Sequence, residues 1–180
     1  MKYYILTNDW QHDSLIDEVI PNIYDEISMN LGTPFKELPP IDLIVKKGKI
    51  PDSIPNHQLF LVFNEKLREI INKFGNDLQY FDINILNEKK ELIDSEQYKI
   101  VNLLNIVDAI DYEKSELDLD ADGDIFSIDL LILKEIFKNS PIFRLKGFTT
   151  LVLVREDLAQ EIVNANCTGI EFYEANGFRI

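Results

Sequence analysis

The residues of this sequence that could do chemistry gather in one acidic stretch, DLDADGDIFSID, at positions 118–129. Carboxylates at alternate positions of a loop can surround a Ca²⁺ ion, because hard oxygen ligands suit this cation, and Gly123 would permit the sharp turn. The stretch therefore suggests a possible calcium site. Its candidate ligands are Asp118, Asp120, Asp122, Asp124 (through its carbonyl) and Asp129.

Other features of the same stretch favour a solvated turn. Phe126 stands at the ninth loop position, where a calcium loop usually has an oxygen-bearing side chain. A helix could continue after Asp129, but no convincing helix precedes the loop and no second loop exists to pair with it. Asp and Gly are also favoured turn residues, and the flanking runs NIVDAI and IFSIDLLIL could be strands. Both interpretations stay open at this point.

Catalytic side chains do not assemble into any recognisable pattern. The two histidines, His12 and His57, lie in polar, loop-like sequence, and Cys167 lies between a predicted helix and a predicted strand. An inert packed thiol is the more common state of such a cysteine. The glycines form no phosphate-binding motif, and no Cys/His cluster suggests zinc. The sequence thus predicts no enzyme, no catalytic residues and no cofactor other than the possible calcium.

The acidic balance of the chain predicts the kind of partner it would bind. The net charge is −14, and residues 108–129 hold nine acids against one base, Lys114. Such a surface repels phosphate backbones and anionic lipids and attracts basic proteins. We therefore expect no binding to nucleic acid or membranes. The first candidates for contact with a protein partner are Glu116, Asp118, Asp120, Asp122 and Asp124.

Length and composition predict one ordinary globular domain spanning residues 1–180. The opening MKYYILTNDW has an apolar run too short for a signal peptide or a membrane span. A single cysteine agrees with a reducing compartment. The expected location is therefore the cytoplasm.

The elements that must position these residues alternate irregularly between strand and helix. In the first half we expect a strand at 1–7, an amphipathic helix at 13–20, an irregular segment at 32–57 with a strand at 41–45, and a helix after Asn64 that ends at Gly75. In the second half we expect two antiparallel strands at 79–86 and 98–107, a helix at 156–165 with Leu158, Ile162 and Val163 inward, a strand at 170–173 and a turn at 176–177. This order predicts an α+β domain with a mostly antiparallel sheet.

Four segments of the second half form a recognisable series: YFDINILN, YKIVNLLNIVDAIDYEKSEL, SPIFRLKGFTTLVLVREDLAQEI and CTGIEFYE. In their order and wording they resemble a family of bacterial immunity proteins from polymorphic toxin systems, immunity protein eleven, formerly a domain of unknown function. The resemblance covers residues 79–174 well and residues 1–74 loosely. The DLDADGD segment matches nothing in the family pattern.

This resemblance implies a small cytosolic protein that binds a cognate toxin and protects the producing cell from it. The acidic surface is consistent with a basic toxin, which the protein would inhibit by occlusion. Two alternatives stay open, namely a calcium-dependent binding module that uses residues 118–129 and an enzyme of unrecognised type.

Overall fold

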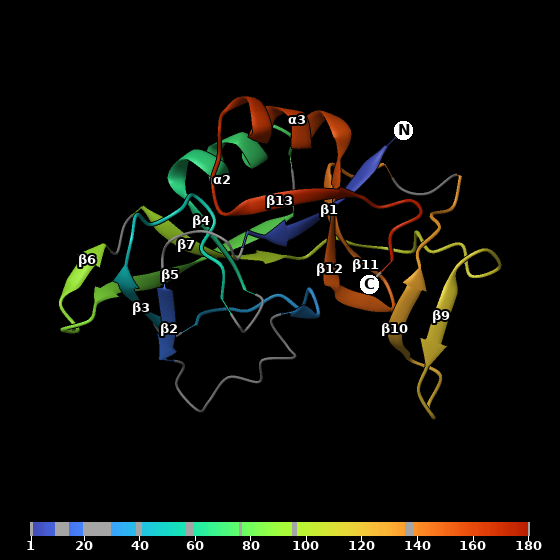
Figure 1. Ribbon diagram of the computed structural model, residues 1–180, viewed down its shortest axis with the longest axis horizontal. Helices are drawn as coiled ribbons and strands as arrows, with labels where there is room; N and C mark the ends of the chain where they lie inside the picture. Colours follow the sequence, from blue (N-terminus) through green and yellow to red (C-terminus); the bar gives the residue numbers. More distant parts are fainter. Residues whose placement is uncertain are drawn as a thin grey trace.

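The computed structural model of this protein describes most of the chain, and of residues 15–19 and 46–47 it describes the backbone alone (Figure 1). The described residues are 2–9, 15–19, 30–38, 41–56, 60–75, 77–94, 97–135 and 139–179.

The first sheet joins the beginning of the chain to its end. Its five strands run in the order β13 (Ile170–Glu174), β1 (Tyr3–Asn8), β12 (Phe148–Arg155), β11 (Ile142–Leu145) and β8 (Ile106–Val107). Strand β1 is antiparallel to both of its neighbours, whereas β8 lies parallel to β11. The strands expected at both ends of the chain are thus confirmed, and they pair with each other.

The second sheet is built from the middle of the chain. It runs β2 (Leu15–Val19), β3 (Ile41–Lys47), β5 (Leu78–Asn87), β7 (Tyr98–Leu103) and β4 (Leu61–Asn64), with β6 (Leu92–Asp94) beside β5. Strands β5 and β7 are antiparallel neighbours, as expected, whereas β3 and β5 are parallel. The strand expected at 98–107 is too long, because β7 ends at Leu103 and residues 106–107 belong to β8 in the first sheet. The sequence did not predict β6, which follows the turn after Asn87.

The helix expected at residues 13–20 is wrong where the structure describes this segment. Residues Leu15–Val19 form strand β2, antiparallel to β3. Apolar Leu15, Ile16 and Val19 fit one face of a helix, but so short a window cannot separate helical from strand periodicity. Pairing with β3 decides the outcome. Residues 13, 14 and 20 lie outside the described part of the chain.

Helices α2 (Glu65–Asn72) and α3 (Glu156–Asn164) lie side by side at the top of Figure 1, α2 next to strand β4 and α3 next to strands β1 and β12. Helix α2 begins at Asn64, whose side chain accepts a hydrogen bond from the Leu67 backbone N–H at 3.0 Å, as the sequence predicts. Helix α3 buries Leu158 and Ile162. The expected inward position of Val163 is wrong, because its side chain is 55% exposed.

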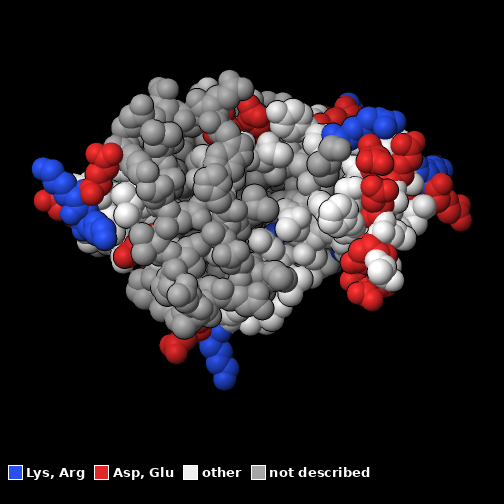
Figure 2. Space-filling model, turned by 60° about the horizontal axis from the view of Figure 1, so that its bottom comes forward, with Lys and Arg blue, Asp and Glu red and all other residues white. Residues whose placement is uncertain are grey.

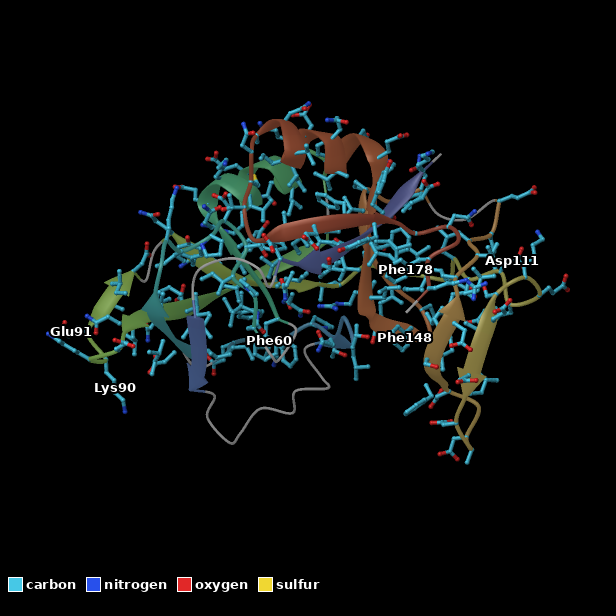
Figure 3. The ribbon with its side chains drawn as sticks, viewed as in Figure 1. Phe60, Lys90, Glu91, Asp111, Phe148 and Phe178 are labelled. Atoms are coloured by element: carbon cyan, nitrogen blue, oxygen red, sulfur yellow. The ribbon has the colours of Figure 1, made fainter. Side chains whose placement is uncertain are left out.

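A third unit, the hairpin of β9 (Glu116–Leu119) and β10 (Ile125–Leu130), lies at the opposite end of the molecule from β6 (Figure 1). Buried Ile128 and Leu131 attach it to the first sheet through Phe143. Figure 3 shows Phe148 and Phe178 near this junction, and both pack against the same apolar cluster.

Within the described residues, two helices lie on mostly antiparallel sheets, which makes this an α+β fold, as the sequence predicts. That the chain is one domain stays a prediction. Among the described residues, no helix is long and apolar enough to cross a bilayer.

Candidate functional site

The acidic stretch forms a tight turn between two strands. One carboxylate oxygen of Asp120 accepts hydrogen bonds from the backbone N–H groups of Asp122 and Asp124, each at 2.9 Å. The Asp120 N–H donates to the Asp124 carbonyl at 2.9 Å, and Gly123 has a φ of +89° that glycine adopts without strain. The turn is thus confirmed, and the run after it forms β10, so a helix after Asp129 is wrong as far as Leu130. The strand before the turn is β9 and not the expected run NIVDAI, of which only Ile106–Val107 form a strand, β8 in the first sheet.

The same contacts bear on the possible calcium site. The Asp124 carbonyl already accepts from Asp120, and the Asp118 carboxylate accepts from the Ser127 hydroxyl at 3.2 Å. Within the part of the chain that the structure describes, no group of three or more His, Cys, Asp or Glu side chains could hold a metal ion. Calcium binding stays an open alternative, and it would require the turn to rearrange.

The five acids proposed for partner contact come together on this hairpin. Glu116, Asp118, Asp120, Asp122 and Asp124 are all exposed, as is Asp129. Figure 2 shows acidic side chains gathered at the end of the molecule where Figure 1 places β9 and β10. The hairpin therefore concentrates negative charge on a projecting element.

Nearby basic side chains neutralise only part of this charge. They form ion pairs with acids at the base of the hairpin. The partners of these basic side chains all lie outside the turn. Within the described residues, the carboxylates of residues 118–124 make no ion pair. The pairs are Lys114 with Asp111, Lys134 and Lys146 with Asp108, and Arg179 with Glu116.

Large apolar side chains also lie exposed among these acids. Phe126 is 77% exposed, Leu119 58% and Tyr112 52%. Phe126 occupies a bulge in β10, because the pairing register shifts between Ile125 and Ser127. In the sequence, Phe126 stands out only as a mismatch to a calcium loop. The signal that could have found it is an aromatic residue within an otherwise acidic hairpin.

A hollow of about 490 Å³ lies against the inner face of the hairpin. Apolar side chains from both strands line it, together with one carboxylate. Its lining consists of Tyr112, Ser115, Leu117, Leu119, Gly123, Asp124, Ile125 and Gly147.

The segments that carry the family resemblance have structural roles. In IFRL, Arg144 is 1% exposed and donates a hydrogen bond to the Thr149 carbonyl at 2.8 Å, and burial lowers its pKa to about 10. In CTGI, the Thr168 carbonyl accepts from the Ser53 N–H at 3.0 Å. These residues hold segments of the fold together.

The other residues considered for reactivity are the cysteine and the two histidines. Cys167 is half-buried, and burial raises the pKa of its thiol, which fits the packed cysteine that the sequence predicts. His12 and His57 lie outside the described residues.

The fold and the site define a small α+β protein with an acidic, partly apolar hairpin at one end. Residues 10–177 match the Immunity protein family (Imm11), so the chain belongs to this family. The match confirms the resemblance found in the sequence and extends it over most of the first half. A comparison with curated proteins finds no match.

Proposed function

We propose that this protein binds a cognate toxin and blocks it without doing chemistry of its own. Membership of the immunity family carries this proposal, because immunity means protection of a cell from a toxin. Occlusion of a toxin requires only affinity and shape complementarity, so the protein needs no catalytic group. A basic toxin fits the net charge of −14.

We place the contact surface on the β9–β10 hairpin. Interfaces take most of their affinity from a few buried aromatic or apolar anchors, and charges around them mainly set the association rate. The hairpin offers both, since exposed Phe126 and Leu119 stand among the acids of residues 116–124. Toxins that cut nucleic acid bind phosphates with basic surfaces, and an acidic hairpin could occupy such a surface.

Growth rescue tests the proposed function. The reading frames beside the gene of this chain are searched for a large protein with a variable C-terminal toxin domain, and that domain is expressed from an inducible promoter, alone or with this protein. We expect that toxin alone stops growth, that co-expression restores it, and that the two proteins co-purify. Continued toxicity in the presence of folded, soluble protein would contradict the proposal.

A further inference from the structure

The hollow beside the hairpin has a distinctive chemical lining. Leu117, Leu119 and Ile125 supply apolar surface, and Asp124 adds a carboxylate. Leu119 and Ile125 are cross-strand partners, and Leu117 lies two residues before Leu119, so all three share one face of the hairpin. Tyr112 and Gly147 also line the hollow, and Gly147 lies next to Ile125.

This lining remains accessible to a partner. Leu119 and Tyr112 are each more than half exposed. The volume of about 490 Å³ lies within the range of about 300–1,000 Å³ that is common for ligand pockets. The site is therefore large enough for a side chain and open enough for one that projects from another protein.

The charges around the hollow select for a cation. The lysines at 114, 134 and 146 all pair with Asp108 or Asp111, whereas Asp124 makes no ion pair among the described residues. An anionic occupant would be repelled by the turn. A second copy of this chain, with a net charge of −14, is likewise disfavoured.

We propose that this hollow receives a long basic side chain, arginine or lysine, from the toxin. The inference rests on the proposed function and specifies its anchor. Arginine and lysine carry an aliphatic stem that packs on apolar surface and a charged head that stays near water or a carboxylate. Here the stem contacts Leu117, Leu119 and Ile125, and the head meets Asp124.

Small probes test the hollow without the toxin. Butylguanidinium and butylammonium carry the cation and the stem, and butylurea is a neutral control. In amide NMR spectra of the labelled protein, we expect both cations at millimolar concentration to shift residues around the hollow, such as Leu119, Asp124 and Gly147. Butylurea should shift them much less. Absence of saturable shifts, or shifts spread evenly over the acidic surface, would overturn the inference.

Two single substitutions separate the hollow from the general negative field. Asp124→Asn and Asp122→Asn remove the same charge two residues apart, but only Asp124 lines the hollow. Both retain the backbone groups that bond to Asp120. We expect Asp124→Asn to weaken binding of butylguanidinium about fivefold, as for an exposed ion pair, and Asp122→Asn to have a much smaller effect. Equal effects of the two substitutions would overturn the inference, because the cation would then respond to the overall negative charge and not to the hollow.

The same variants in toxin binding distinguish the inference from the proposed function. A third variant, Leu119→Ser, removes part of the apolar lining. The inference holds if the wild type binds the toxin and if both Asp124→Asn and Leu119→Ser weaken the complex more than Asp122→Asn does. If all three variants bind as wild type does, the inference fails while the proposed function stands. If the wild type does not bind the toxin, the proposed function fails, whatever the probes show. Equal melting temperatures of the variants exclude misfolding as the cause.

Discussion

At the scale of single residues, Gly169 controls how two distant segments approach each other. A Cβ atom at this position would overlap the Ser53 carbonyl oxygen, and the backbone φ is +80°. The neighbouring Thr168 carbonyl accepts from the Ser53 N–H, and the Asp9 N–H donates to the Gly169 carbonyl. The close approach of Ser53 is therefore the steric reason why glycine stands at this position of the CTGI segment.

Substitution of Gly169 by alanine should destabilise the fold more than an equivalent change in open space. Gly75 is a matched control, because its φ is +66° and a Cβ atom added there would meet no other atom within 4 Å. Gly75→Ala should cost about 1–2 kcal/mol from left-handed backbone strain. Gly169→Ala should cost about 1–3 kcal/mol more because it clashes with backbone. Urea denaturation measures both, and equal losses would contradict the close approach.

Asp52 connects three segments near the same place. Its carboxylate accepts from the N–H and hydroxyl of Thr168 at 2.8 and 3.0 Å and from the Asn64 amide at 2.6 Å. Burial alone would raise the pKa of this carboxyl, but these hydrogen bonds and the Lys66 ammonium hold it below its usual value. Asp52 thereby fixes the start of α2 against the segment before β13.

This arrangement predicts a pH-dependent contribution to stability. Because the folded-state pKa lies below the unfolded value of about 3.9, the contribution is fully present above that value and is lost as the pH falls through the folded pKa. Asp52→Asn should therefore be less stable than wild type at pH 7, by about 1–3 kcal/mol, and the difference should shrink at acid pH. The free energy of unfolding at pH 7 and at pH 3 checks this. A difference that is constant with pH would show that the charge of Asp52 is irrelevant.

Residue roles were predictable where they depend on local sequence. The Asn64 cap follows from a capping residue directly before a helical pattern, and its bond to Leu67 is three residues away. The need for Gly169 was not predictable, because Ser53 lies 116 positions earlier in the chain. Val163 fitted the apolar pattern of α3 but is exposed, since the helix turns its face toward Leu158 and Ile162.

At the scale of elements, the hairpin should set the rate at which toxin is captured. A triple reversal, Asp118→Lys, Asp122→Lys and Asp124→Lys, leaves Asp120 to hold the turn. We expect association at low salt to slow at least about tenfold and to lose most of its salt dependence. Stopped-flow association at several NaCl concentrations measures both quantities.

A control variant with the same change in net charge distinguishes the effect of where the charges lie from the effect of the total charge. Glu69→Lys, Glu88→Lys and Glu161→Lys change acids on α2, after β5 and on α3, away from the hairpin in Figure 1. We expect a clearly smaller effect from this variant. If both triple variants slow association equally, net charge rather than the hairpin steers the toxin.

The hairpin also makes a prediction about calcium. Two N–H groups occupy one oxygen of Asp120, so the turn is stable without a cation. We therefore expect millimolar Ca²⁺ to leave the melting temperature unchanged, with Mg²⁺ at equal ionic strength as the control. A calcium-specific rise of a few degrees would reveal a site formed by rearrangement of residues 118–129.

Elements with a strong local signal were predictable, and those fixed by pairing were not. Helix α3 combines helical periodicity with a following breaker, and β5 alternates apolar and polar residues over its length. Strand β2 has only five residues, and its state follows from the neighbouring β3. The hairpin stayed ambiguous in sequence because its turn residues suit a metal loop equally well.

At the scale of the whole molecule, the placement of the site depends on contacts that link distant parts of the chain. The acidity of residues 116–124 was evident in sequence. Their projection beyond the body was not, because it follows from how β9 and β10 attach to the first sheet. The order of strands in that sheet was equally hidden, since β1 pairs with strands from the last part of the chain.

The segment after β13 is a second attachment for the hairpin. The Leu131 N–H donates to the Phe178 carbonyl at 2.9 Å, and the Gly177 N–H donates to the Leu131 carbonyl at 2.7 Å. The Asn176 side chain accepts from the Leu133 N–H at 3.1 Å. Phe178 adds apolar contact with the cluster beneath the hairpin.

A chain that ends at Ala175 should therefore keep its fold but lose rigidity in the hairpin. We expect faster amide exchange over residues 125–133 and unchanged protection in β5 and β7, which lie in the other sheet. Toxin should dissociate faster from this variant, because a mobile hairpin loses more conformational freedom on binding. Hydrogen exchange by mass spectrometry and the dissociation rate measure the two effects. Unchanged exchange at 125–133 would mean that the segment after β13 is not needed, and that the contacts of Ile128, Leu131 and Ile132 with the rest of the fold hold the hairpin.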